Sequence, residues 1–427
     1  MAVEVAGIEA APRDAARTEG SWVYPAIPML AAAIAFPWIL YTDLQRMYGL
    51  TTSGDVAHYQ HFVWTITQGD WHHLELILFP IAGIELLWPS PILLAILSAA
   101  ALAATAPTAY LFFRAILPAE LKASLWLAIA LAAPIPFWAA TQQAASDVFH
   151  PDNLALPFAL AAAWAALRGK RALMWSFVVL TLACGENQAY SVLVLAFLTR
   201  SYAAPEIKKH WRLVFYVAIF WFLMNAILVH PHFNPALPAL VTTAGIVASM
   251  FGLPLVAPRW LVLAIPPFLA TAFDPNYVLL SMFPLMVAGV IGARRAPSIR
   301  PALAIVIALA ALIIGWGTGQ VPPALLASDS DYNQPNAVAQ LQTAAAVIPK
   351  DAPVNADASL EAWLANRPTI NDFPNELDPG DYVLIDIQAA NTSSAQRLAA
   401  LGALPTSGRR LLYDDGRFQV WSPVGDY

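Results

Sequence analysis

The stretch that decides the fold runs from Pro91 to Phe113, reads PILLAILSAAALAATAPTAYLFF, and contains no charged residue. A transmembrane helix needs about 20 predominantly apolar residues, so this stretch predicts a helix that crosses a bilayer. Comparable runs recur as far as residue 317. The predicted spans are Val23–Tyr41, Pro91–Phe113, Leu125–Ala140, Leu154–Leu167, Ala172–Cys184, Gln188–Leu198, Leu213–Val229, Leu240–Val256, Leu261–Phe273, Tyr277–Ile291 and Pro301–Gly317. The fold class is therefore a membrane all-α polytopic bundle of about eleven transmembrane helices.

The composition supports a bilayer as the solvent. Of the 427 residues, 59% are hydrophobic and 12% are charged, whereas a soluble domain carries about 25% charged residues. The 15 tryptophans are typical of side chains at the membrane interface. One cysteine, Cys184, excludes an intrachain disulfide, and no stretch is basic enough to predict nucleic-acid binding.

The positions of the basic residues predict the orientation. Up to residue 318, fifteen of the sixteen Lys and Arg residues fall in alternate gaps between the predicted spans, and Arg46 is the exception. Because cytoplasmic loops are enriched in Lys and Arg, we expect a cytoplasmic N-terminus and an external C-terminus in a bacterial inner membrane. The acidic first twenty residues are unlike the basic start of a cleaved signal.

Three regions follow from this reading. Residues 1–21 form a cytoplasmic segment, and residues 22–318 form the transmembrane domain, whose first external loop (42–90) carries two interfacial helices. Residues 319–427 are richer in Asp, Asn and Pro, and they predict a small external (periplasmic) α/β domain. Its expected strands are Val354–Ala356, Thr369–Ile370, Tyr382–Ile385, Arg410–Tyr413 and Arg417–Trp421, the last two joined by an Asp414-Asp415-Gly416 hairpin turn.

Seven of the eight histidines fall in the predicted external loops, with carboxylates beside them. The segments Asp55–Glu75, Asp147–Asp152 and His230–His232 could converge on one outward-facing cavity, although polar loops are also expected simply because water reaches them. Asp55, His58 and His61 are spaced i, i+3, i+6. Such a set could hold a divalent metal or pair a base with its partner, but the spacing also arises by accident.

Glu186 is the other candidate. It lies between two apolar helices at Gly185, the expected turn of a hairpin formed by residues 172–198, which could alternatively form one long helix. An ionisable residue at such depth is costly and is a functional candidate by default. A turn that reaches the interface, where water solvates the carboxylate, is the structural alternative. His150 is a plausible partner for Glu186.

Ordered motifs resemble a known family. Phe149-His150-Pro151-Asp152, the basic turn at 168–171 and Gly185-Glu186-Asn187 resemble motifs of the bacterial membrane-protein family called domain of unknown function 2079, as do segments 54–57, 73–76 and 257–259. That family has a Lys where this chain has Gly185 and an acid where it has Asn187. Its layout is similar to that of GT-C glycosyltransferases, polytopic enzymes that use polyprenyl-phosphate sugars.

The resemblance implies roles for particular residues. Asp55 would be the catalytic carboxylate of the first external loop, and His150 and Asp152 would supply the polar cluster of the second loop, with Glu186 beneath them. The cofactors implied are a polyprenyl-phosphate lipid and a divalent metal ion. The external loops before residue 319 offer only Arg46 as a cation for a phosphate.

Three functions follow as hypotheses. The first is a lipid-linked-sugar glycosyltransferase that acts at the external face. The second is a non-catalytic accessory subunit of a larger membrane complex that has lost the ancestral activity, with other membrane proteins as partners. The third is a transporter that uses Glu186, which the absence of a visible internal repeat disfavours. All three place the chain among membrane lipids.

Overall fold

The computed structural model describes residues 23–52, 54–70, 75–118, 122–228, 250, 253–267, 278–295, 336–375, 377–389 and 395–425. It is mostly helical and divides into two compact units. Unit 1 contains Met1–Ala35, Ala101–Gln142 and Leu154–Val321, and unit 2 contains Phe36–Ala100, Gln143–Asn153 and Pro322–Tyr427. Each unit is described by itself below.

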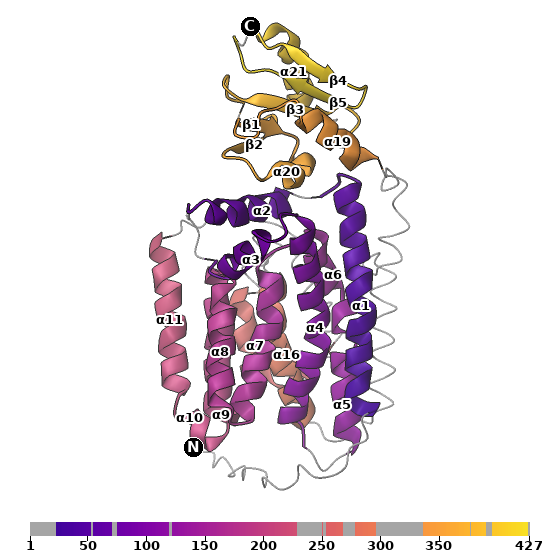
Figure 1. Ribbon diagram of the computed structural model, residues 1–427. Coiled ribbons are helices and arrows are strands. Elements are labelled where there is room, and N and C mark those ends of the chain that lie inside the picture. The colour runs from indigo at the N-terminus through magenta and orange to yellow at the C-terminus, as the bar shows by residue number, and fades with distance from the viewer. Residues whose placement is uncertain are drawn as a thin grey trace. The chain divides into compact units, whose positions relative to one another are not determined.

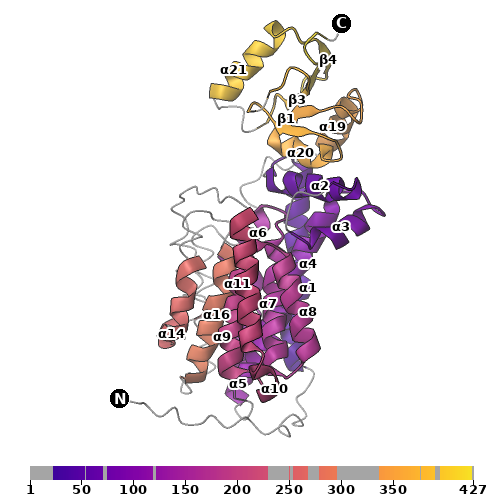
Figure 2. The ribbon, with the colours of Figure 1, turned by 90° about the vertical axis from the view of Figure 1, so that its left-hand side faces the viewer.

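Unit 1 is a bundle of apolar helices. Its long helices lie side by side in Figures 1 and 2, and shorter ones connect them. The helices of unit 1 are the first half of α1 (Val23–Tyr48), the second half of α4 (Ile92–Ile116), α5 (Lys122–Ala132), α7 (Asp152–Leu167), α8 (Arg171–Ala183), α9 (Ala189–Tyr202), α10 (Pro205–Lys208), α11 (Trp211–Leu228), α13 (Leu253–Val256), α14 (Pro258–Leu261) and α16 (Val278–Arg295).

Three of the described helical stretches are long and apolar enough to cross a membrane: Tyr24–Tyr48, Ile92–Ile116 and Ser124–Ser146. Helix α11 leaves large apolar side chains exposed, among them Tyr216, Phe220 and Phe222, as expected where lipid replaces water. A multi-pass membrane protein is therefore supported. The number eleven stays a prediction, because the predicted spans Leu240–Val256 and Pro301–Gly317 lie wholly or largely outside the described residues, and the predicted span Leu261–Phe273 is described only as far as Pro267.

The predicted span Leu125–Ala140 is not one regular helix. Helix α5 ends at Ala132, a 3₁₀ turn covers Ile135–Phe137, and α6 covers Ala139–Ser146. The interruption falls at Pro134 and Pro136, since proline lacks the N–H that a helix interior needs and clashes with the preceding turn.

Residues 172–198 form two helices rather than one. Helix α8 ends at Ala183, and α9 begins at Ala189 after a 3₁₀ turn at Glu186–Gln188. Gly185 between them has a nearly extended backbone, with φ +157° and ψ +166°. The indole Nε1–H of Trp221 on α11 donates to the Gly185 carbonyl at 3.3 Å, so a third helix holds the turn in place.

The helical part of unit 2 begins with the end of α1 (Val23–Tyr48), followed by α2 (Gly54–Thr67) and α3 (Leu78–Glu85). Two helices were expected in segment 42–90, and α2 and α3 lie there; the external position of this segment stays a prediction. The predicted end of the first helix at Tyr41 is wrong, because the helix continues to Tyr48. Asp43 and Met47, four residues apart on one face, are both fully buried and extend the packed face of α1.

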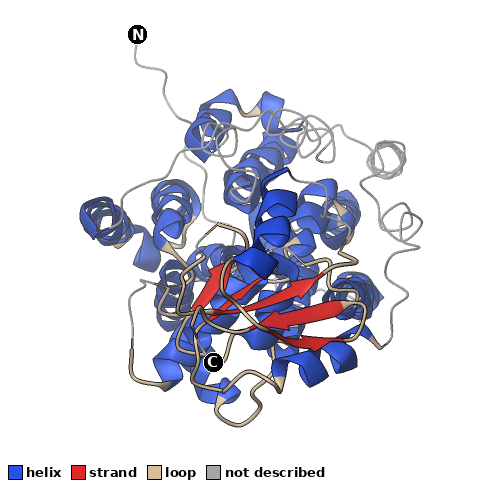
Figure 3. Ribbon diagram, turned by 90° about the horizontal axis from the view of Figure 1, so that it is seen from above, coloured by secondary structure: helices blue, strands red, loops and turns tan. Residues whose placement is uncertain are grey.

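The C-terminal part of unit 2 is a five-stranded sheet with helices on both faces (Figure 3). The strand order is β2-β1-β3-β5-β4, with β2, β1 and β3 parallel and β5 and β4 antiparallel. The strands lie at the predicted places: β1 (Val354–Ala356), β2 (Ile370–Asp372), β3 (Tyr382–Asp386), β4 (Leu411–Asp414) and β5 (Phe418–Trp421).

Side chains alternate between the two faces of this sheet. Helices α19 (Ala337–Ala345) and α20 (Ala358–Leu364) share an apolar cluster with Leu384 and Phe418. On the opposite face, Val383, Ile385 and Trp421 pack with the end of α21 (Ala395–Ala403). The alternation follows from the two-residue period of a strand.

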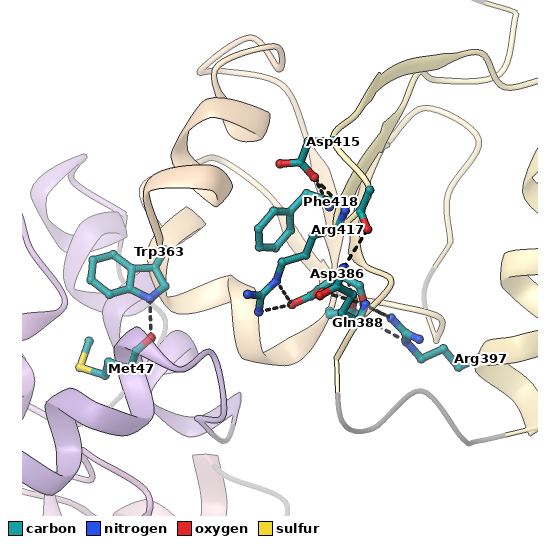
Figure 4. Close-up of polar contacts among 10 residues, drawn as sticks. Met47, Trp363, Asp386, Gln388, Arg397, Asp415, Arg417 and Phe418 are labelled. Carbon is teal, nitrogen blue, oxygen red and sulfur yellow. Dashed lines mark hydrogen bonds and ion pairs between the residues drawn. The ribbon is translucent and has the colours of Figure 1, made fainter. Parts of the chain in front are cut away.

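The end of α1 joins the first of these clusters. Leu50, just past the helix, is 5% exposed and belongs to the α19–α20 cluster. The Trp363 Nε1–H donates to the Met47 carbonyl at 3.1 Å (Figure 4), and the Trp363 ring lies 5.5 Å from that of Tyr48. Unit 2 therefore unites a membrane-helix end and the sheet in one packed body.

Candidate functional site

Helix α2 presents two candidate side chains on one face. Asp55 lies in its first turn, where a carboxylate stabilises the positive end of the helix dipole. Tyr59 follows four residues later, so its side chain and that of Asp55 are neighbours on the helix surface. Asp55 is partly exposed and Tyr59 is buried.

The segment 145–152 joins α6 to α7 and carries a strained residue. Val148 has φ +64°, a conformation that is unusual for a β-branched residue and costs about 1–3 kcal/mol. The Phe149 amide donates to the Asp147 carbonyl across this tight turn at 2.7 Å. The strain is tolerated where the surroundings over-determine the backbone, and here it immediately precedes His150.

His150 lies between a phenol and a carboxylate, all three within unit 2. Its Nε2 is 3.0 Å from the Tyr59 hydroxyl, and its Nδ1 is 3.5 Å from Asp152 Oδ2. The Asp152 amide also donates to Nδ1, at 3.3 Å. In the neutral ring this bond places the proton on Nε2, facing Tyr59, and a second proton on the ring would face the Asp152 carboxylate.

His150 and its carboxylate neighbour Asp152 differ in burial. The His150 side chain is 22% exposed, whereas that of Asp152 is 3% exposed. A partly accessible imidazole with a buried carboxylate beside it can accept and return a proton. Of the predicted catalytic residues, the structure brings His150 and Asp152 together and adds Tyr59.

Asn153 anchors the same segment. Its side-chain amide donates to Ser98 Oγ at 2.8 Å and to the Ala144 carbonyl at 3.3 Å. Ser98 lies on the first half of α4, which belongs to unit 2. These bonds fix the start of α7 and therefore the position of His150.

Sequence reasoning missed Asp43 because it placed this residue in a loop. The Asp43 side chain is fully buried in α1, and neither of its oxygens accepts a hydrogen bond from a described residue. Arg46 Nη1 lies 4.0 Å from Asp43 Oδ1 and donates to the Ala145 carbonyl at 3.3 Å. An acid and a base three residues apart within an apolar helix were the available signal.

The histidines of the predicted metal trio point to other partners. His58 packs edge-on against Phe62, with ring centroids 3.9 Å apart. His61 Nδ1 lies 3.1 Å from the Ala365 carbonyl, and its ring stacks on Trp64. Among the described residues, no group of three His, Cys, Asp or Glu side chains is placed to hold a metal ion. The i, i+3, i+6 spacing drifts around the helix, which accounts for this.

Glu186 belongs to unit 1, whereas Tyr59, His150 and Asp152 belong to unit 2. It opens the 3₁₀ turn between α8 and α9 and is partly buried. Its predicted contact with His150 stays a prediction, as does a common cavity for Asp55 and His150. The external histidines His72, His73, His230 and His232 lie outside the described residues.

The comparisons with known proteins concern the fold. No model of a protein family matches the sequence, and no curated protein matches it; the resemblance to domain of unknown function 2079 therefore stays a prediction. A solved structure that is similar is apo ArnT from Cupriavidus metallidurans, with a TM-score of 0.53 and 13% identity over 93% of this chain and 97% of that chain. ArnT is a GT-C glycosyltransferase. The chain is therefore a membrane protein with a GT-C-like fold.

Proposed function

We propose that this chain is an integral membrane glycosyltransferase that takes its sugar from a polyprenyl-phosphate carrier at the external face. One observation carries the proposal: the segment 145–152 brings His150 against Tyr59 of α2, one helical turn from Asp55, in a chain with a GT-C-like fold. A carboxylate and a histidine are side chains that can accept a proton in such a transfer.

The chemistry divides between the two loops. Asp55 accepts the proton of the acceptor hydroxyl as that oxygen forms its bond to the anomeric carbon of the sugar. The bond from that carbon to the lipid phosphate breaks, and the phosphate leaves with the electron pair. His150, which is held by Tyr59 and Asp152, is a second group that can accept this proton. The role predicted for Glu186, which belongs to unit 1, stays a prediction, and membrane lipid surrounds the protein. The divalent metal expected at Asp55, His58 and His61 is not used.

The test measures transfer from a radiolabelled polyprenyl-phosphate sugar in proteoliposomes. Asp55→Asn and His150→Ala should each lower the rate by about 10²- to 10⁴-fold, the usual contribution of a general acid or base. Tyr59→Phe should lower it by about fivefold, since it removes one hydrogen bond worth about 1 kcal/mol. Gln68→Ala, exposed at the end of α2, is the matched control. Wild-type rates in both Asp55→Asn and His150→Ala would refute the proposal.

The alternative is a non-catalytic subunit of a larger membrane complex, and the scarcity of cations favours it. Arg46 is the single Lys or Arg in segments 36–100 and 143–153, and it already contacts Asp43 and Ala145. A lipid phosphate calls for cations beside it. Stoichiometric co-purification with other membrane proteins, together with no transfer by the isolated chain, would support this alternative.

The orientation belongs to the same proposal. The N-terminus lies in the cytoplasm and residues 319–427 lie in the periplasm of a bacterium with an inner membrane, as the distribution of basic residues predicts. An alkaline phosphatase reporter fused after residue 427 should be active, because this enzyme works only outside the cytoplasm. Activity of a cytoplasmic reporter at that position would reverse every loop assignment.

A further inference from the structure

Two basic segments of unit 1 lie together at one end of the bundle. The turn 168–171 follows α7, and the segment 200–212 covers the end of α9, α10 and the start of α11. The Ala204 amide donates to the Ala166 carbonyl at 3.4 Å. A Cβ at Gly169 (φ +72°) would lie 3.2 Å from Glu206 Oε2, so the two segments are in contact.

The charge of this surface is strongly unbalanced. The turn contributes three cations and the second segment contributes four, against one carboxylate, Glu206. We call this surface the basic end. All seven cations are exposed. They are drawn from segments of one unit, and helices α8 and α9 carry them to the end of the hairpin away from Gly185. The seven cations are Arg168, Lys170, Arg171, Arg200, Lys208, Lys209 and Arg212.

Indole rings border the basic end, as at a membrane interface. Lys170 Nζ lies 4.5 Å from the ring centre of Trp164, and Arg200 Cζ lies 4.8 Å from that of Trp211. Tryptophan favours the headgroup level of a bilayer, and cations beside it are at the depth of lipid phosphates. Water alone would not require this combination of aromatic rings and exposed cations.

Other helices end at the same place. Arg294, in the last turn of α16, donates to the Ile116 carbonyl at the end of α4 at 3.2 Å. Its guanidinium lies 5.7 Å from the ring centre of Tyr202 at the end of α9. The basic end is therefore part of a packed rim where α4, α9 and α16 end together, rather than a free loop.

His210 reports on the potential there. Its burial and the charges of Arg171 and Lys209 lower its pKa below the usual 6.5. Burial is the largest cause of this shift, and the two neighbouring cations add to it. An anion placed among Arg171, Lys208 and Lys209 would cancel part of the field of these cations.

We propose that the basic end is a binding site for the phosphate headgroups of anionic phospholipids in the adjacent leaflet. Each Lys or Arg near an anionic surface adds to the attraction, which salt reduces. Four neighbouring cations are enough for a preference of anionic over zwitterionic lipid of at least about tenfold, which corresponds to about 1.4 kcal/mol. The proposal does not depend on a transferase activity.

The experiment uses the full chain in nanodiscs of phosphatidylcholine with and without phosphatidylglycerol. Native mass spectrometry should find phosphatidylglycerol retained about tenfold over phosphatidylcholine. The variant R171Q/K208Q/K209Q/R212Q should lose that preference. The control K350Q/R410Q removes two exposed cations of unit 2 and should keep it.

A second readout needs no charge variant. The pKa of His210, followed by NMR, should rise in phosphatidylglycerol discs and fall back in high salt, whereas inorganic phosphate at the same concentration should leave it unchanged. An equal rise with inorganic phosphate would reassign the site to a free anion. Equal retention of both lipids by the wild type would overturn the proposal, as would capture of an acidic protein with no lipid preference.

Discussion

The two units of this chain treat charge in opposite ways. Among the described residues, all ten buried charged side chains belong to unit 2, and unit 1 buries none. Unit 1 buries apolar side chains and a few hydroxyl and amide groups, and the seven cations of the basic end lie exposed. The ten are Asp43, Glu85, Asp152, Asp357, Arg367, Asp381, Asp386, Arg397, Arg409 and Arg417.

The difference follows from the solvent and from the available partners. A charge buried in an apolar bundle is costly unless it has a partner. In unit 2 the partners exist: Arg397 donates twice to the Asp357 carboxylate at 2.9 Å, and Arg417 donates to Asp386 at 2.7 and 3.0 Å (Figure 4). Unit 2 should therefore depend on single polar contacts, and unit 1 should not.

The largest effect is expected at Asp386. Asp386→Ala would leave the Arg417 guanidinium buried without its carboxylate and would free the Gln388 amide. Breaking such a pair costs about 3–5 kcal/mol. Hydrogen exchange of β3 and β5, followed by mass spectrometry, should accelerate accordingly. Arg410→Ala, an exposed cation of the same unit, should change little, and similar acceleration in both variants would contradict the role of the buried pair.

A substitution at Leu50 tests whether an apolar contact stabilises unit 2 as much as the buried ion pair of Asp386 does. Leu50→Ala removes a side chain that is 5% exposed from the α19–α20 cluster, and burial losses of this kind cost about 2–5 kcal/mol. Limited proteolysis should cut the C-terminal sheet faster in this variant. Leu398→Ala on α21, where the side chain is 55% exposed, provides the control. Resistance equal to the wild type would mean that the end of α1 does not stabilise the sheet.

Glu361 makes the stability of unit 2 depend on pH. Burial, Asp372 and Asp357 raise its pKa from 4.5 to about 8. The folded state keeps the proton that the unfolded chain releases above pH 4.5, so stability falls as pH rises from about 4.5 to about 8. The slope from this group is at most about 1.4 kcal/mol per pH unit.

Glu361→Gln should remove that slope and stabilise the protein at pH 8 and above relative to the wild type. Denaturant unfolding of both proteins from pH 5 to pH 9 measures it. Glu376→Gln, a second acid-to-amide change in the same C-terminal region, is the control. Parallel pH curves for wild type and Glu361→Gln would show that the carboxyl ionises as freely in the folded state as in the unfolded chain.

The smallest effect is expected in unit 1. Lys208→Gln at the basic end changes an exposed side chain and should leave stability within about 0.5 kcal/mol, while it weakens retention of anionic lipid. Thermal unfolding in nanodiscs of phosphatidylcholine checks the first statement. Destabilisation comparable to that of Asp386→Ala would end the contrast between the two units.

Local signals were sufficient for many elements. The β1 strand has the predicted bounds, and Asp414-Asp415-Gly416 forms the expected turn, with the Gly416 amide bound to Asp414 Oδ1 at 2.8 Å and the Phe418 amide bound to Asp415 Oδ1 at 2.7 Å. Turns depend on residues that are adjacent in the chain. The hairpin at Gly185 was also predicted, since one long helix would have separated two basic clusters across the membrane.

The errors arose where apolarity alone was a poor guide. The sequence reading ended the first helix at Tyr41 because Thr42, Asp43 and Arg46 interrupt the apolar run. It also carried a span across Pro134 and Pro136, where the helix is interrupted. A polar residue ends an apolar run but does not end a helix whose buried face continues.

By itself, the sequence determined that this is a membrane bundle and where most helices and strands lie, because hydrophobic length and turn residues act over a few neighbours. Only the tertiary structure decided which polar groups meet. Tyr59 and His150 are 91 residues apart, and Arg46 lies 99 residues from Ala145. No local pattern records such pairings, because they depend on how distant segments pack. The same packing decides whether Asp43 is solvated or buried.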